Sequence, residues 1–194
     1  MAPDETATDE TAPGSAARHD VEHLVVMGVS GSGKSTIGQL LATELGRPFG
    51  EGDQFHPEEN VAAMSAGIPL TDEHRAPWLV ILRDWMTSEA PAGRSTVLAC
   101  SALRRAYRDV LRGAEGRVRF VHLADEAALI EARQAAREGH FMPASLMSSQ
   151  RATLEPLAED EDGVMVSVDQ EPSQVVASIR TALDAAPGPG AQVP

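Results

Sequence analysis

Short apolar runs alternate along the chain with longer segments in which apolar residues recur at helical spacing. Five of the short runs predict strands, at 23–27, 48–52, 96–100, 118–123 and 164–168. The segments between and after them predict helices, at 36–45, 57–64, 72–86, 103–112, 125–137, 146–157 and 173–183. Because strands and helices alternate, the pattern predicts an α/β fold with a five-stranded parallel sheet covered by helices on both faces.

The two ends of the chain lack this alternation. Residues 1–20 are rich in Ala, Thr, Pro and acidic residues and are predicted to form a disordered tail, and 187–194 to form a second one. A single domain is therefore expected at 21–186. The N-terminal segment lacks the basic start and apolar core of a secretory signal, and no apolar run approaches the ~18 residues of a membrane span.

Composition narrows the possible partners. The net charge of −13 argues against a nucleic-acid partner, because proteins that bind a long phosphate backbone usually carry a basic face. Cys100 is the only cysteine, so no internal disulfide can form. We therefore expect a cytoplasmic protein in which Cys100 is a small buried residue rather than a catalytic thiol.

The segment 28–35, GVSGSGKS, lies between a predicted strand and a predicted helix and matches the pattern G-x-x-x-x-G-K-[ST]. Loops of this kind wrap backbone N–H groups around phosphate at the positive end of the following helix. Lys34 is expected to reach the β- and γ-phosphates of a nucleotide, and the Ser35 hydroxyl to bind Mg²⁺. The predicted nucleotide-binding residues of this segment are Gly28, Ser30, Gly31, Ser32, Gly33, Lys34, Ser35 and Thr36.

Lys34 is the only lysine among the 16 lysines and arginines of the chain. A compact ammonium fits a tight phosphate loop, whereas the wide planar guanidinium of arginine does not, so we expect arginine to fail at this position. The lack of a second lysine also excludes the N-K-x-D motif by which GTPases read guanine. The loop therefore predicts an enzyme that uses ATP.

Candidate acceptor-binding residues follow the second predicted strand, in GDQFHPEEN. Asp53 is expected at the carboxyl end of that strand, where ligands bind in open α/β sheets. A carboxylate there can orient an acceptor hydroxyl or accept its proton, and His56 follows three residues later. The alternative is an Asp-initiated turn that caps the next helix.

Five stretches, in order along the chain, resemble the gluconate kinase family of P-loop kinases: GVSGSGKS, EGDQFHPEEN, GIPLTDEHRAPWL, CSALRRAYRDVLR and REGHFMPASLMSSQRATLEPL. The resemblance covers about residues 23–185. It implies the P-loop NTPase fold of shikimate and nucleoside monophosphate kinases, with a small helical lid at about 134–150. It also implies that the protein uses ATP and Mg²⁺ to phosphorylate D-gluconate at its 6-hydroxyl, and it suggests a homodimer.

A small polyhydroxy carboxylate needs an arginine fork for its carboxylate and polar groups for its hydroxyls. The candidates for contact with it are Asp53, His56, Arg75, Ser101, Arg104, Arg108 and His140. Arg104, Arg108 and Arg112 recur every four residues, so we expect them on one helical face, which is either a substrate-binding face or a solvated basic one. For Arg75 the alternative is a surface ion pair with a neighbouring acidic residue.

The resemblance places Arg133 and Arg137 on or beside the lid, where they are expected to contact the phosphates of ATP, with Arg137 closing over the γ-phosphate. The alternative is a pair of surface ion pairs. The family usually has a lysine where this chain has Ala63, and this difference keeps open a kinase for another small hydroxy acid, such as shikimate. A non-catalytic nucleotide-binding regulator is the third possibility.

Overall fold

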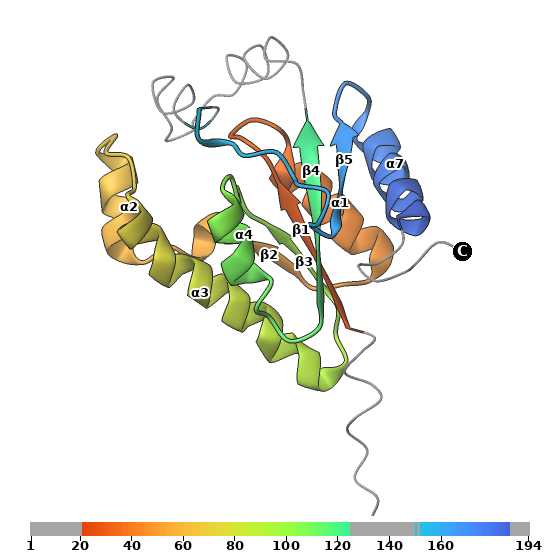
Figure 1. Cartoon of the computed structure of the whole chain (residues 1–194), viewed down its shortest axis with the longest axis horizontal. Helices are drawn as coiled ribbons and strands as arrows, with labels where there is room; N and C mark the ends of the chain where they lie inside the picture. Colours follow the sequence, from red (N-terminus) through yellow and green to blue (C-terminus); the bar gives the residue numbers. More distant parts are fainter. Residues whose placement is uncertain (1–20, 125–149, 151, 187–194) are drawn as a thin grey trace, which may run out of the picture.

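The computed structural model describes residues 21–124, 150 and 152–186 (Figure 1). The strands are β1 (Glu22–Met27), β2 (Phe49–Glu51), β3 (Thr96–Ala99), β4 (Arg117–Ala124) and β5 (Gly163–Ser167). The helices are α1 (Lys34–Leu45), α2 (Glu58–Ser65), α3 (Asp72–Glu89), α4 (Arg105–Leu111) and α7 (Pro172–Ala185). Two 3₁₀ turns are η2 (Gly52–Phe55) and η3 (Ala90–Ala92). Over the described part of the chain, no helix has the length and apolar character needed to cross a bilayer.

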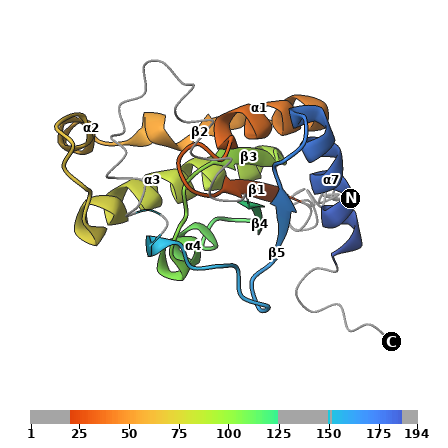
Figure 2. The ribbon, with the colours of Figure 1, turned by 90° about the horizontal axis from the view of Figure 1, so that it is seen from above.

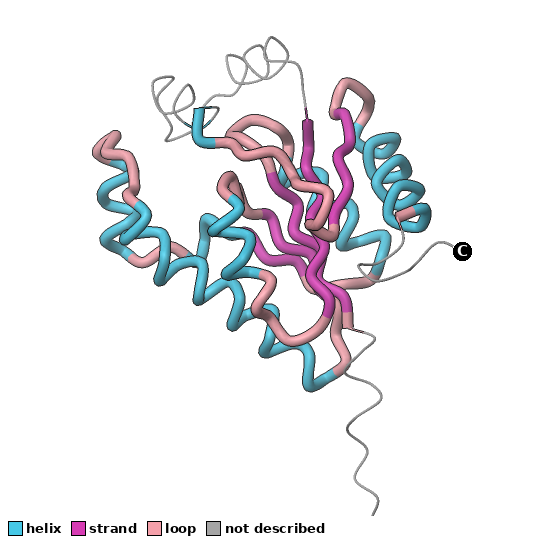
Figure 3. Tube along the Cα trace, in the orientation of Figure 1, coloured by secondary structure: helices cyan, strands magenta, loops and turns pink. Residues whose placement is uncertain are grey.

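The strands form one parallel sheet in the order β2-β3-β1-β4-β5 (Figure 3). β1 is the central strand, with Val25 opposite Leu98 of β3 and Phe120 of β4. Because all five strands run in one direction, their carboxyl ends meet at one edge, which is where ligands bind in open α/β sheets. The predicted five-stranded parallel sheet is confirmed.

Helices cover both faces of the sheet (Figure 1). Leu41 of α1 and Ile179 of α7 belong to a core cluster on one face, together with Val121 of β4. Leu82 of α3 packs on the other face with Phe120 of β4. α2 lies at the end of the domain opposite α7 (Figure 2). The result is a three-layer arrangement in which two apolar helix layers bury both faces of one sheet.

Hydrogen bonds cap the start of α3 and connect this helix to η2. Thr71 and His74 form a capping box, because the Thr71 hydroxyl accepts the His74 N–H and His74 Nδ1 accepts the Thr71 N–H. One turn later the buried Trp78 donates its indole N–H to the Gly52 carbonyl at 2.8 Å. This bond fixes η2, which carries Asp53, against α3.

Two predicted helices differ from the structure. The helix predicted at 103–112 begins only at Arg105, because the backbone of Arg104 is extended. The helix predicted at 146–157, with a break near Pro156, ends earlier than expected, because residues 154–157 are not helical. The predicted tails at 1–20 and 187–194, the helix at 125–137 and nearly all of the lid at 134–150 lie outside the described residues.

Candidate functional site

The segment between β1 and α1 is a tight loop that ends at the first turn of a helix. Gly33, which precedes α1, has φ 92°, a left-handed conformation that glycine adopts without strain. Gly28 has φ 144°, and a Cβ there would lie 2.9 Å from Ser32 Oγ and 3.0 Å from the Leu123 carbonyl oxygen. The glycines therefore allow a backbone path that presents N–H groups at the helix N-terminus, as an anion site requires.

Neighbouring segments hold this loop in place. The Gly28 N–H donates to the Ser101 carbonyl after β3 at 3.3 Å. The Ser30 N–H donates to Gln150 Oε1 at 2.8 Å, a residue that sequence reasoning did not single out. Lys34 Nζ donates to the Val29 carbonyl at 2.9 Å, so its ammonium lies back along the loop itself. Lys34 also lines the cavity that opens beside the phosphate loop.

A cavity opens between the phosphate loop, the turn after β2, the first turns of α3 and the end of β3. Its polar lining is formed by Ser30, Lys34, Asp53, His56, Arg75, Ser101 and Gln150. Its apolar lining is formed by Met64, Ile68, Pro69, Leu70 and Trp78. The structure thus brings together, at the carboxyl edge of the sheet, six of the predicted site residues from four separate segments.

Asp53 lies in η2, just beyond the end of β2. Its backbone carbonyl accepts the His56 N–H at 3.5 Å, so a turn is present, but Asp53 does not cap the next helix, because the N-cap of α2 is Pro57 and receives no side-chain hydrogen bond. Asp53 is also exposed and lines the cavity together with Lys34. The two roles are compatible, because the turn uses the backbone of Asp53 and leaves the carboxylate for a ligand.

His56 stacks on the indole of Trp78, with ring centroids 4.2 Å apart and planes tilted by 15°. Asn60 Nδ2 lies 3.3 Å from His56 Nδ1 and donates to it, so the neutral imidazole carries its proton on Nε2. Burial lowers the pKa of His56, while Asp53 opposes this effect and Arg75 adds to it. The ring is therefore neutral at pH 7 and has one N–H to donate.

Arg75 lines the same cavity from the first turn of α3. Its Nη1 donates to the Tyr107 hydroxyl at 3.2 Å, and its guanidinium carbon lies 5.7 Å from the centre of the Tyr107 ring. The surface ion pair that the sequence left open for Arg75 is absent from the contacts recorded between described residues. Arg75 is held by a neutral phenol and not by a carboxylate.

A second carboxylate, which sequence reasoning missed, stands at the end of β2. Burial raises the pKa of Glu51 and Asp53 adds to the rise, while a hydrogen bond from the Ser35 hydroxyl and the charge of Lys34 lower it. Glu51 is thus beside the residue predicted to bind Mg²⁺. Its position two residues before Asp53, at a strand end, is the signal that could have found it.

Comparison with known proteins gives matches to small-molecule kinases. The family model described as shikimate kinase matches residues 30–184. A gluconokinase of Gluconobacter oxydans is 51% identical over 79% of this chain and 86% of its own length. The thermoresistant gluconokinase of Escherichia coli is 39% identical over 84% of this chain and 94% of its own. The chain belongs to the gluconokinase family.

Solved structures of gluconokinase-family and related proteins share the fold. A gluconokinase from Sinorhizobium meliloti has 43% identity and a TM-score of 0.76, covering 86% of this chain and 93% of that one. A sugar kinase from Janibacter sp. has 54% identity and a TM-score of 0.79, covering 86% and 96%. A shikimate kinase from Aquifex aeolicus, at 19% identity and a TM-score of 0.53, shares the fold alone. The chain is therefore a P-loop kinase of the gluconokinase family.

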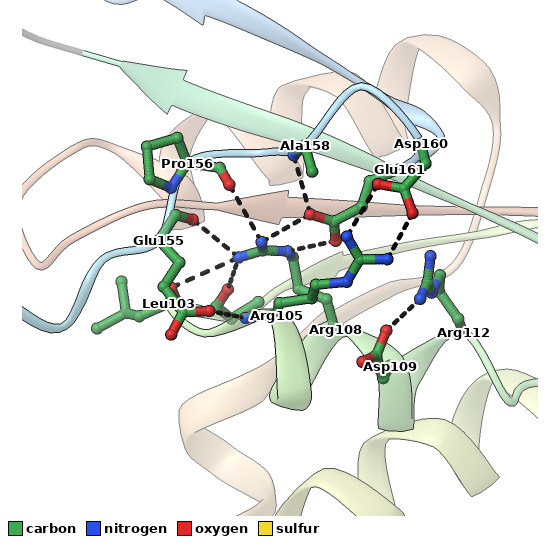
Figure 4. Close-up of polar contacts among 11 residues, drawn as sticks. Leu103, Arg105, Arg108, Asp109, Arg112, Glu155, Pro156, Ala158, Asp160 and Glu161 are labelled. Carbon is green, nitrogen blue, oxygen red and sulfur yellow. Dashed lines mark hydrogen bonds and ion pairs between the residues drawn. The ribbon is translucent and has the colours of Figure 1, made fainter.

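The prediction that Arg108 contacts substrate is wrong. Its side chain is buried and forms a two-pronged ion pair with Glu161, at 2.7 Å from both Nε and Nη2 (Figure 4). Its remaining N–H groups donate to backbone carbonyls, which include those of Ala102, Glu155 and Pro156. All five guanidinium N–H groups are therefore used inside the protein, and Arg108 does not line the cavity.

Arg104 and Arg112 do not share one helical face with Arg108, contrary to the prediction from their spacing. Arg104 precedes α4, pairs with Asp72 at 2.6 Å and lies outside the cavity lining. Arg112 follows α4 and pairs with Asp109, in agreement with the solvated alternative. The three residues therefore point to three different surroundings, and none of them lines the cavity.

A second cavity, of about 390 Å³, adjoins the other side of the phosphate loop. From the phosphate loop and the start of α1, its lining includes Gly31, Ser32, Gly33 and Thr36. From the segment after β5 and the start of α7, it includes Val168, Gln170, Glu171, Pro172 and Val175. Four residues predicted to bind nucleotide thus gather here, away from Asp53 and Arg75. The phosphate loop therefore separates two hollows, one on each side.

The predictions for the lid region and for Cys100 have different outcomes. Arg133, Arg137 and His140 lie outside the described residues. Cys100 is buried, and burial raises the pKa of its thiol to about 12, so the thiol stays protonated. The expectation that Cys100 is a packing residue is confirmed.

Proposed function

We propose that this protein is an ATP-dependent gluconokinase that transfers the γ-phosphoryl group of ATP to the 6-hydroxyl of D-gluconate. The observation that carries the proposal is the cavity that Lys34 shares with Asp53, His56 and Arg75. In this cavity the ammonium of the phosphate loop lies near a carboxylate and an imidazole that can bind hydroxyl groups and a guanidinium that can bind a carboxylate. The names of the relatives support the same substrate.

The two cavities provide separate binding places for ATP and for gluconate. We propose that the adenosine part of ATP occupies the cavity lined by residues 168–175 and that its phosphates follow the loop toward Lys34. The acceptor then lies in the cavity with Asp53 and Arg75. Donor and acceptor then meet at Lys34, and in-line transfer requires the attacking hydroxyl and the leaving oxygen of ADP to lie on opposite sides of the γ-phosphorus.

Each polar group of the acceptor cavity has a role in this reaction. The Arg75 guanidinium holds the carboxylate of gluconate, and the neutral His56 donates Nε2–H to a hydroxyl oxygen. The Asp53 carboxylate orients the 6-hydroxyl and accepts its proton as the new P–O bond forms and the bond from the γ-phosphorus to the leaving oxygen of ADP breaks. Lys34 stabilises the charge on the phosphoryl oxygens during transfer.

The residues near the phosphate loop fit a magnesium ion. The Ser35 hydroxyl and the Glu51 carboxylate lie together, and oxygen ligands of this kind, in small number beside substrate phosphates, are what Mg²⁺ prefers. We propose that these two residues hold the ion, directly or through water. When bound, Mg²⁺ would neutralise negative charge on the phosphate oxygens of ATP.

A coupled kinase assay with ATP and Mg²⁺ tests the function against gluconate, shikimate, glycerate and nucleoside monophosphates. We expect turnover with gluconate alone, and the product is identified by phosphorus NMR as the 6-phosphate. Turnover of another acceptor in place of gluconate contradicts the substrate. ATP binding with no transfer to any acceptor supports the regulator that the sequence left open.

Replacing Asp53 with Asn tests its role as the base. We expect Asp53→Asn to lower kcat by about 10²- to 10⁴-fold, because the amide cannot accept the proton, with little change in ATP binding. Asp84→Asn is the matched control, since Asp84 pairs with Arg83 on the surface of α3. A kcat for Asp53→Asn close to that of Asp84→Asn contradicts the assignment.

We further infer a cytoplasmic protein, because its one cysteine is a buried, protonated thiol and no disulfide can form within the chain. The homodimer implied by the family resemblance stays a prediction, and light scattering of the purified protein measures it.

A further inference from the structure

Tyr107 and three side chains around it form a polar network that reaches the acceptor cavity. The Tyr107 hydroxyl lies 2.5 Å from Asp72 Oδ1 and 3.2 Å from Arg75 Nη1. Arg104 Nη1 donates to the other oxygen of Asp72 at 2.6 Å. Of these four residues only Arg75 lines the cavity.

The chemistry of the groups sets the direction of each bond. An ionised carboxylate only accepts and a guanidinium only donates, so the hydroxyl donates to Asp72 and accepts from Arg75. The hydrogen bond from Tyr107 lowers the pKa of Asp72, with the charges of Arg104 and Arg75 adding to this effect. Burial, followed by the bond to Asp72, raises the pKa of Tyr107. The phenol thus stays protonated and Asp72 stays ionised across the neutral range.

In this arrangement Arg75 bonds to Tyr107 and forms no ion pair with Asp72, although the charge of Arg75 acts on that carboxylate. Asp72 is only three residues before Arg75 on α3, at the spacing of a helical ion pair. However, Asp72 has one oxygen occupied by Tyr107 and the other by Arg104. Arg75 rests instead on the hydroxyl and the ring of Tyr107. A neutral acceptor at that place competes far less with an incoming anion than a carboxylate does.

We propose that Tyr107 is a positioning residue for Arg75, which it holds in the cavity for the carboxylate of the acceptor, while Arg104 occupies Asp72. The proposal rests on the proposed function, because it assigns Arg75 to the acceptor carboxylate. Arg104 then influences acceptor affinity without touching the acceptor.

The first test is Tyr107→Phe, which removes one oxygen atom and keeps the ring. We expect KM for gluconate to rise about three- to tenfold, the size of one lost hydrogen bond, with kcat and KM for ATP within twofold of wild type. A structural role alone changes both KM values or the melting temperature. An unchanged KM for gluconate overturns the proposal.

The second test couples Tyr107 to Arg75. Arg75→Gln removes the guanidinium that Tyr107 positions, so adding Tyr107→Phe to Arg75→Gln should change kcat/KM for gluconate by less than twofold. If the two effects instead multiply, Tyr107 acts independently of Arg75 and the proposal fails. Because kcat/KM is read at low gluconate concentration, a weakly binding variant still gives a value.

The third test compares two arginines near the ends of α4. Arg104→Gln frees Asp72 to attract Arg75, and we expect KM for gluconate to rise severalfold. Arg112→Gln is the matched control, since Arg112 pairs only with Asp109 in the contacts recorded for it, and it should leave KM unchanged. Equal values for both variants contradict the role of Arg104. A wild-type protein that does not phosphorylate gluconate refutes the proposed function instead, so the two failures are distinguishable.

Discussion

At the scale of single residues, the site depends on which chemical group occupies each position. Lys34 lies in the one place where the arginine-rich composition of the chain gives way to lysine. Its ammonium donates to the Val29 carbonyl of the same loop, within a backbone path made possible by Gly28 and Gly33. A planar guanidinium has neither the compactness nor the single-point geometry for that path.

Lys34→Arg keeps the charge and changes only the shape. We expect kcat to fall by at least about 100-fold, because a group that stabilises transition-state charge is displaced. Arg180→Lys is the reverse control, since Arg180 pairs with Glu44 on the exposed surface, and activity should not change. Kinase activity of Lys34→Arg within a few-fold of wild type would refute the steric argument.

At the scale of elements, arginines anchor the segment that leads into β5. Arg108 pairs with the buried Glu161, and Arg105 pairs with the exposed Asp160 (Figure 4). Burial acts to raise the pKa of Glu161, but its bonds with Arg108 and with the Ala158 N–H outweigh burial, so the pKa is lowered. The carboxylate is therefore charged at neutral pH, and the ion pair fixes this segment against α4.

Arg108→Met should lower the free energy of unfolding by about 3–5 kcal/mol, because it leaves Glu161 as an uncompensated buried charge. The double variant Arg108→Met with Glu161→Met should recover most of this loss. Arg105→Gln, at an exposed pair on the same helix, should cost at most about 1 kcal/mol. Urea unfolding measures all three, and equal losses for Arg108→Met and Arg105→Gln would contradict the buried pair.

At the scale of the whole molecule, the core contains two histidines on neighbouring strands. His23 of β1 is 0% exposed and bonds to Thr96 Oγ1 and the Glu115 carbonyl, at 2.8 and 2.9 Å. His122 of β4 is 5% exposed, and its Nδ1 has no hydrogen-bond partner among the described residues. Burial lowers the pKa of both rings, and the charge of Arg108 adds to the effect at His122. The folded protein therefore resists their protonation.

This resistance makes stability depend on pH. Below about pH 6.5 the unfolded chain takes up protons that the folded rings refuse, so the free energy of unfolding should fall, by at most about 1.4 kcal/mol per pH unit for each ring. The raised pKa of Glu51 acts in the opposite sense, so the comparison must be between variants. His122→Phe should show a smaller loss than wild type in urea unfolding between pH 7.5 and about 5.5. Equal losses contradict the role of His122.

The sequence by itself determined the features that depend on neighbouring residues. Strand and helix order follow from apolar spacing, and the phosphate loop follows from glycines and a lysine within eight consecutive positions. The position of Asp53 and His56 at the cavity was also predictable, because both residues follow the end of a predicted strand. Each of these depends on local backbone geometry, which a short stretch of chain already specifies.

Only the tertiary structure decided where the long side chains of the arginines point. Spacing placed Arg104 and Arg108 on one face, but Arg104 precedes the helix, and the partner of Arg108 is Glu161, 53 positions away. Likewise, Asp72 could pair with Arg75 by spacing, and it binds Tyr107, which is 35 positions away. Periodicity names a face of a helix but not what packs against it. That choice is made when distant segments meet and every buried charge must find its partner.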